Sequence, residues 1–185
     1  MVVKITVVKS GFIGVTTLIE ALLDERAARK DISIHSISSG SKMHTEASED
    51  LEKNALLYDT DFFILVTPNA SLDVPKELAF NLSKHKPTIV VSDNPASKSI
   101  NDFSNENLGY IVVQGDPLIG IRQEFLDPIE MSNFNSDVLK VLSITGAFRA
   151  LVHEIDLVIS AINNSQPIVL PRVIVDKHKA LSHSG

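Results

Sequence analysis

The chain contains no cysteine and no tryptophan, and it has only two tyrosines. Without cysteine it can form neither a disulfide nor a thiolate metal site, and a cytoplasmic location is the expectation. The scarcity of aromatic rings removes the platform on which nucleic-acid bases usually stack. Its 17 basic residues are outnumbered by 23 acidic ones, for a net charge of -6. Binding to nucleic acid, whose phosphates attract clustered Lys and Arg, is therefore not expected.

Long apolar runs are also missing. No run approaches the ~20 residues that a membrane-spanning helix needs, so no membrane contact is expected. The apolar start of the chain lacks a basic flank and a cleavage site, which favours a first strand over a signal peptide. Hydrophobic residues nevertheless make up 44% of the 185 residues. That share is typical of a folded protein with one sizeable core.

Motifs of hydrolytic and metal-dependent enzymes are absent as well. The sequence has no Gly-x-Ser-x-Gly elbow and no Walker A motif. None of its six histidines is paired at a spacing typical of zinc ligands, so no metal is expected. A chain without an evident nucleophile fits chemistry that a cofactor carries, because the protein then only orients two reactants. It fits a non-catalytic binding protein equally well.

Short apolar segments alternate with helical patterns through the first two thirds of the chain. This alternation predicts an α/β fold, a Rossmann-like parallel sheet with helices on both faces. The predicted strands are residues 2–8, 32–37, 62–66, 87–91 and 109–113, and the predicted helices are residues 15–25, 46–58 and 75–84. A last apolar segment, residues 168–175, contains Pro171 and therefore predicts a small edge strand.

From Pro128 to Ile162, apolar residues recur every three or four positions. This spacing predicts one long helix with an apolar stripe, in which Gly146 is the position for a break or kink. Such a stripe commonly packs on a second helix, so we expect self-association through residues 131–162. We accordingly divide the chain into a Rossmann-like domain, residues 1–127, and a helical extension with a terminal strand, residues 128–185.

Ligands of open parallel sheets bind beyond the carboxyl ends of the strands. In the first loop, Gly11 and Gly14 would let backbone amides approach a phosphate, although this short pattern is as typical of a simple tight turn. The second loop lacks the acidic residue that binds the ribose of NAD, and its Ser41 and Lys42 favour an anionic ligand. The third and fourth loops contribute further candidates, namely Thr67, Pro68, Asn69, Asp93 and Pro95.

The most heavily charged stretch lies just before the helical stripe. Asp127 is a predicted N-cap, with Pro128 at the first helical position and Glu130 as the third residue of a capping box. Helix capping explains these residues without any function. It does not explain Arg122 and Glu124.

Residues 120–131 read Gly-Ile-Arg-Gln-Glu-Phe-Leu-Asp-Pro-Ile-Glu-Met. This stretch resembles the signature Gly-Ala-Arg-Arg-Glu-Phe-Leu-Asp-Pro-x-Glu-Met of the deazaflavin-dependent methylenetetrahydromethanopterin dehydrogenases of methanogenic and related archaea. Further matches lie at residues 22–27, 42–43, 145–149 and 170–176. The resemblance thus spans essentially the whole chain.

The resemblance implies an oxidoreductase of one-carbon metabolism. Its reaction would be reversible hydride transfer between methylenetetrahydromethanopterin and coenzyme F-420, without a metal, in an oligomer whose active site lies near a subunit interface. The resemblance also implies coenzyme contacts for the loop candidates, namely Gly11, Gly14, Thr67, Pro68, Asn69, Asp93 and Pro95. For the tetrahydromethanopterin-type carrier it implies contacts from Arg122, Glu124 and Asp127. It assigns no catalytic side chain.

Some positions depart from the family pattern. Phe12 and Val15 stand where that pattern has Asn and Thr, and Val66 stands where it has a glycine before Pro-Asn. The pattern also continues beyond residue 185 with further helices. An alternative hypothesis is therefore a shortened, non-catalytic homologue that acts as a ligand-binding or oligomeric structural protein.

Overall fold

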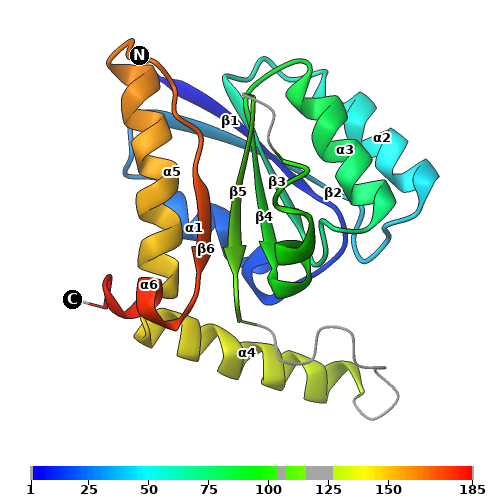
Figure 1. Ribbon diagram of the computed structural model, residues 1–185, viewed down its shortest axis with the longest axis vertical. Coiled ribbons are helices and arrows are strands. Elements are labelled where there is room, and N and C mark those ends of the chain that lie inside the picture. The colour runs from blue at the N-terminus through cyan, green and yellow to red at the C-terminus, as the bar shows by residue number, and fades with distance from the viewer. Residues whose placement is uncertain (1, 104–106, 116–126, 185) are drawn as a thin grey trace.

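The computed structural model describes residues 2–103, 107–115 and 127–184 (Figure 1). Six parallel strands form one sheet in the order β2-β1-β3-β4-β5-β6. The strands are β1 Val3–Lys9, β2 Ile32–Ser38, β3 Phe62–Thr67, β4 Thr88–Asp93, β5 Leu108–Val113 and β6 Arg172–Val175. The predicted parallel α/β sheet is confirmed, and β6 lies at its edge directly after Pro171.

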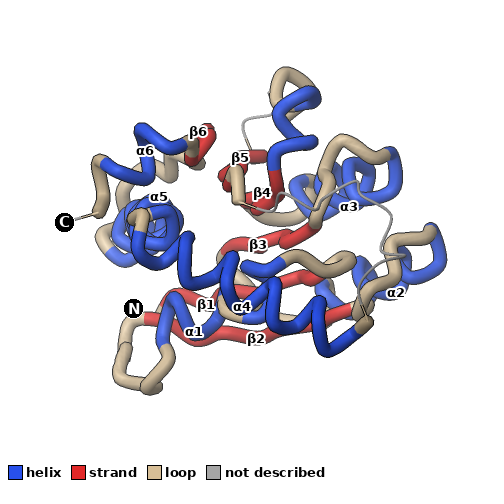
Figure 2. The backbone as a smooth tube through the Cα atoms, turned by 90° about the horizontal axis from the view of Figure 1, so that it is seen from below, coloured by secondary structure: helices blue, strands red, loops and turns tan. Residues whose placement is uncertain are grey.

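Helices cover both faces of this sheet. They are η1 Gly14–Thr17, α1 Ile19–Asp24, α2 Thr45–Ala55, α3 Asp73–Ser83, η2 Asn94–Ser99, α4 Pro128–Ile144, α5 Ala147–Asn163 and α6 Lys177–Leu181. On one face, α2 and α3 contribute Leu51 and Leu78 to a buried cluster with Phe63. On the other face, α1 and α5 contribute Ile19 and Ile155 to a second cluster. Figure 2 shows α3 and α5 on opposite sides of the strands.

The central strands are buried on both sides, because helices pack on both faces of the sheet. All residues of β3 and β4 are buried, which fits their continuous apolar sequence. The edge strand β2 is less buried, with Ser33, His35 and Ser36 exposed. The continuous apolar patterns of residues 62–66 and 87–91 therefore match the central positions of these two strands.

The predicted helical stripe over residues 128–162 is divided at Gly146, the position expected for a break, into two separate helices, α4 and α5. Gly146 separates them in a left-handed conformation with φ of 85°. A side chain there would also collide with the C-terminal segment, since an added Cβ would lie 2.7 Å from Ser184 N. Only glycine meets both conditions easily. In Figure 1, α5 lies along the sheet while α4 crosses beyond the ends of the strands.

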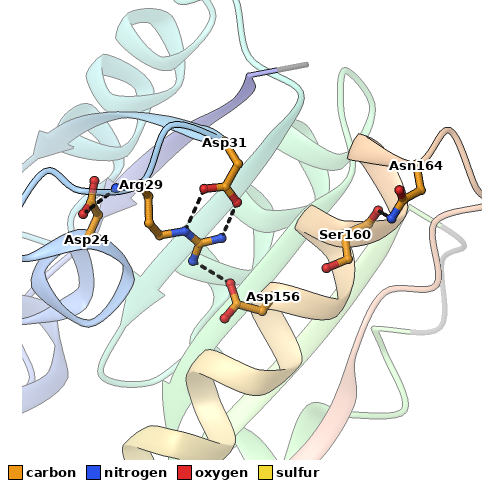
Figure 3. Close-up of polar contacts among 6 residues, drawn as sticks. All are labelled: Asp24, Arg29, Asp31, Asp156, Ser160 and Asn164. Atoms are coloured by element: carbon orange, nitrogen blue, oxygen red, sulfur yellow. Dashed lines mark hydrogen bonds and ion pairs between the residues drawn. The ribbon is translucent and has the colours of Figure 1, made fainter.

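An ion-pair cluster joins α5 to the turn that precedes β2, far away in the sequence (Figure 3). Arg29 Nε and Nη2 donate to the two carboxylate oxygens of Asp31 at 3.1 and 2.7 Å, and Nη1 donates to Asp156 Oδ1 at 2.7 Å. Hydrogen bonds from Arg29 hold the pKa of Asp31 below its usual value. Through this cluster the turn between α1 and β2 is joined to α5.

The two predicted parts of the chain share one sheet and one core. The final strand, β6, pairs with β5, and Leu151 of α5 lies in the same cluster as Ile5 of β1. A domain boundary at residue 127 stays a prediction. Among the described residues, none of the helices has the length and apolar character that crossing a bilayer requires.

Candidate functional site

Because all six strands are parallel, their carboxyl ends lie together along one side of the sheet, which we call the carboxyl edge. The register places Lys9 beside both Ser38 and Val66, and Asp93 beside Val113. The loops that contain the sequence-predicted ligand residues therefore gather along this edge, as expected for an open parallel sheet. Arg122 and Glu124 lie outside the described residues.

The first three loops meet around Met43. Gly11 has φ of 78°, and an added Cβ would lie 2.5 Å from Met43 Sδ and 3.0 Å from Pro68 Cδ. Thr67, which is buried, directs its hydroxyl at the same sulfur atom at 3.8 Å. Predicted residues Gly11, Thr67 and Pro68 are thus brought together. Their meeting point, Met43, was not predicted as a site residue, and only its inclusion in a family match pointed to it.

Ser39 connects the first two loops by hydrogen bonds. The Ser39 hydroxyl donates to Lys42 O at 2.6 Å, and the amide of Gly11 donates to Ser39 Oγ at 3.4 Å. The amide of Ser39 donates to Lys9 O at 3.1 Å. These bonds fix the second loop against the end of β1, so the two loops form one surface.

The third loop is held against the fourth strand. The amide of Ala70 donates to the buried Ser92 hydroxyl at 3.0 Å. The side chain of Asn69 makes a local hydrogen bond, in which its Oδ1 accepts from Ser71 N at 3.0 Å. Pro68 and Asn69 are half-buried and remain at the surface of the edge.

The other end of the edge is covered by α4. An added Cβ on Gly14 would lie 3.5 Å from Leu139, and one on Gly115 would lie 2.8 Å from Leu142. Because α4 lies directly over Gly14, the backbone of this predicted phosphate contact is buried. Figure 2, which looks onto this edge, shows α4 passing across the strands.

Asp93 lies beneath this cover. Its side chain is only 4% exposed and, as the N-cap of η2, accepts a bond from the amide of Asn94. Asp93, Gly14 and Leu142 surround a gap of about 10 Å³. Gln114 Nε2 donates to Asn94 Oδ1 at 3.0 Å and so joins the fourth loop to the fifth. Pro95 is half-buried in the first turn of η2.

Asp127 begins α4, as predicted. Its carboxylate accepts bonds from Ile129 N and Glu130 N, each at 2.8 Å, and Pro128 follows at the first helical position. Asp127 is exposed. The predicted N-cap and first-position proline are confirmed, and both bonds use Asp127 Oδ1, whereas the capping-box role of Glu130 stays a prediction.

Lys9, at the end of β1, is paired with Glu20 of α1 at 2.6 Å. Burial alone would raise the pKa of Glu20. Hydrogen bonds from Lys9 and Ser36 outweigh it and leave the pKa of Glu20 lowered. The pair ties the first helix to the edge of the sheet. In the part of the chain that is described, no three His, Asp or Glu side chains gather as metal ligands would.

An open hollow of about 450 Å³ lies beside this edge, between the end of β2 and α2. Ser39, Lys42 and His44 line one part of it, and Glu46 and Asp50 line another. The hydroxyl, ammonium and imidazole groups suit a polar or anionic ligand group, whereas the two carboxylates oppose negative charge nearby. A ligand's anionic part would therefore lie on the Lys42 side.

Comparison with known proteins gives a consistent result. The family model described as methylene-5,6,7,8-tetrahydromethanopterin dehydrogenase matches residues 3–185. An F420-dependent methylenetetrahydromethanopterin dehydrogenase of Archaeoglobus fulgidus is 46% identical over 181 residues, which are 98% of this chain and 66% of that protein. One of Methanocaldococcus jannaschii is 39% identical over 183 residues, again 98% of this chain and 66% of the relative.

A solved structure is similar over almost the same range. It is the F420-dependent methylene-tetrahydromethanopterin dehydrogenase in complex with methylene-tetrahydromethanopterin and coenzyme F420. The TM-score is 0.89 and the identity is 32%, covering 95% of this chain and 65% of that one. The chain thus spans about two thirds of the length of the relatives it matches.

Proposed function

The chain belongs to the methylene-5,6,7,8-tetrahydromethanopterin dehydrogenase family, and from this premise we propose that it catalyses reversible hydride transfer between methylenetetrahydromethanopterin and coenzyme F-420. The observation that carries the proposal is the likeness, at a TM-score of 0.89 and 32% identity, to a dehydrogenase in complex with both molecules. The residues that resemble the family signature, 120–131, led to the same family.

The loops at the carboxyl edge are the part of the chain to which we assign the ligands. The three loops that meet at Met43 contact one another and form a partly apolar surface. The hollow beside β2 contributes the polar side chains of Ser39 and Lys42. We assign the coenzyme to the loop residues Gly11, Thr67, Pro68, Asn69, Asp93 and Pro95, with Gly14 as a buried support. When bound, coenzyme F-420 supplies or accepts the hydride. The chain's own task is to hold the two reacting rings close and aligned.

The covered end of the edge would exclude water from this arrangement. Leu139 and Leu142 close over Gly14 and Gly115, and the gap that remains near Asp93 is only about 10 Å³. A water-poor neighbourhood protects a hydride donor and strengthens nearby hydrogen bonds. We assign Arg122, Glu124 and Asp127, which precede this cover, to the carrier.

Two of the three substitutions that motivated the non-catalytic alternative no longer argue against activity. Val15 and Val66 are buried in the core, with exposed fractions of 3% and 0%. Their apolar side chains therefore fill the protein interior and do not replace polar groups on the ligand surface. Of the three departures, only Phe12 is exposed.

The activity is tested by mixing the purified chain with reduced coenzyme F-420 and methenyl-tetrahydromethanopterin. A hydride from the reduced deazaflavin forms the new C–H bond of the methylene carbon, and the deazaflavin also releases a proton. We expect the absorbance of oxidised coenzyme to rise. No spectral change, together with no binding of either molecule by calorimetry, would reject the proposal.

Two glycine variants sharpen this test. Gly11→Val should abolish coenzyme binding, because Gly11 has positive φ and its position is crowded by Met43 and Pro68. Gly40→Val is the matched control. Gly40 also has positive φ, at 63°, but an added Cβ would meet nothing within 4 Å. Equal affinity of both variants would argue against the joined loops as the coenzyme site.

We further propose that the protein self-associates, and that α4 contributes the surface. The α5 part of the predicted stripe is used within the chain, since Phe148, Ile155 and Ile159 are buried. On α4, Val141 and Ile144 are exposed and three residues apart, so they share a helix face. Sedimentation at micromolar concentration should show an oligomer that Ile144→Lys weakens. A monomeric wild type would contradict this. A cytoplasmic location stays a prediction.

A further inference from the structure

Phe12 is an aromatic side chain that lies at the surface of the described structure. It is 48% exposed, whereas its neighbours Gly11 and Ile13 are buried. The ring contacts found among the described residues join other side chains and do not include Phe12. It also belongs to neither buried cluster of the core.

The backbone on both sides of Phe12 is fixed by contacts that its own side chain does not make. Gly11 has φ of 78°, and its amide points at Ser39 Oγ at 3.4 Å. On the other side, the amide of Ile13 donates to Thr16 Oγ1 at 3.1 Å, and the Ile13 side chain enters the core. The turn therefore presents residue 12 outward whatever its side chain is.

The position of this turn is informative. Phe12 follows the carboxyl end of β1, between the residue packed on Met43 and the residue beneath Leu139. It thus lies where the open and the covered parts of the edge meet. Parallel sheets bind ligands at this edge. A half-exposed phenyl ring on this fixed turn offers a flat apolar face on which another planar ring can stack.

We propose that Phe12 is a ligand-contact residue that sets ligand preference, because its ring packs against a flat conjugated heterocycle bound at this edge. The heterocycle is the deazaflavin of the coenzyme or the pterin of the carrier, which share this chemistry. The inference rests on the proposed function, since it takes both molecules as ligands of the chain.

The test compares Phe12→Leu with Phe12→Tyr in the full chain. Leucine keeps apolar bulk but removes the aromatic face, whereas tyrosine retains it. Calorimetric titrations use coenzyme F-420 alone and methylene-tetrahydromethanopterin alone. We expect Phe12→Leu to weaken one of the two by about 3- to 10-fold and Phe12→Tyr to bind as the wild type does. The titration that weakens identifies which ring is stacked.

Leu57→Ala is the matched control. Leu57 is also an exposed apolar residue, but it lies in the turn between α2 and β3, at the opposite edge of the sheet. Its substitution should leave both affinities unchanged, and all three variants should keep the wild-type melting temperature.

A second readout separates stacking from a general change of the loop. Protons of a ligand ring stacked on Phe12 should shift upfield in NMR spectra of the wild-type complex and return toward their free values with Phe12→Leu. Wild-type affinity of Phe12→Leu for both molecules would overturn this inference while leaving the proposed function intact. Failure of the wild type itself to bind either molecule would overturn both.

Discussion

The two parts of the carboxyl edge are built in different ways. At the open part, the loops after β1, β2 and β3 meet at Met43 and are joined by Ser39. At the covered part, Leu139 and Leu142 of α4 press on Gly14 and Gly115. The open part is held largely by hydrogen bonds and one half-buried methionine, and the covered part by apolar contact.

This difference separates stability from binding. Apolar contacts beneath α4 bury surface and should contribute directly to the free energy of unfolding. Hydrogen bonds between exposed loops contribute less to that free energy, but they set the shape that a ligand meets. Substitutions in the covered part should therefore lower stability most, and substitutions in the open part should mainly change affinity.

The largest effect is expected for Gly146→Ala, which attacks the joint that positions α4. The left-handed φ of 85° and the nearby Ser184 backbone should together cost about 3 kcal/mol. Gly40→Ala shares the positive φ but has open space around it, so it should cost about 1 kcal/mol. Urea unfolding of both variants checks this, and equal losses would show that the contact with the C-terminal segment is unimportant.

Leu142→Ala should come next. Leu142 is 7% exposed and packs on Gly115, so its truncation should destabilise the protein by about 2–3 kcal/mol. Leu57→Ala removes the same atoms from a side chain that is 81% exposed and lies outside α4, so it should change the unfolding free energy by less than about 0.5 kcal/mol. If the two variants unfold alike in urea, α4 does not cover the edge in solution.

Arg29→Ala should have a smaller effect. It breaks a partly exposed cluster that contacts both Asp31 and Asp156, which we expect to cost about 1–2 kcal/mol. Lys140→Ala removes a single exposed pair with Asp137 and should cost less than about 0.5 kcal/mol. Thermal unfolding of the two variants compares them, and a neutral Arg29→Ala would mean that core packing alone places α5.

The smallest expected effect is the contribution of Glu20 to the loss of stability at low pH. Because the pKa of Glu20 is lowered in the folded protein, its contribution is fully present above its unfolded value of 4.5. That contribution is lost as the pH falls through the folded pKa. Unfolding free energies measured between pH 7 and 3 should therefore fall less steeply in Glu20→Gln than in the wild type. Parallel curves would show that the pair with Lys9 does not stabilise the edge.

Much of the fold could be predicted because its signals are local. Continuous apolar strands such as 62–67 indicate burial on both faces, and Asp127-Pro128 indicates a helix start. The candidate loops were located because parallel strands necessarily end at one edge. The role of Met43 could not be predicted in this way, since its partners Gly11 and Pro68 are distant in sequence and nothing local links them.

The break at Gly146 shows the limit of periodicity. The apolar spacing from 128 to 162 is the same on both sides of the glycine, so the pattern alone is compatible with one helix. The left-handed turn and its contact with Ser184 decide otherwise. As a result, one half of the stripe enters the core while the other lies across the carboxyl edge.

By itself, then, the sequence determined which segments form strands and helices along the chain, the edge at which we propose that ligands bind, and the family. These follow from short-range preferences and from residues 120–131. Only the tertiary structure decided that α4 covers one part of the edge, that Val15 and Val66 are buried, and that Phe12 is exposed. Burial of a single loop residue depends on which distant segment packs over it, and no local pattern contains that information.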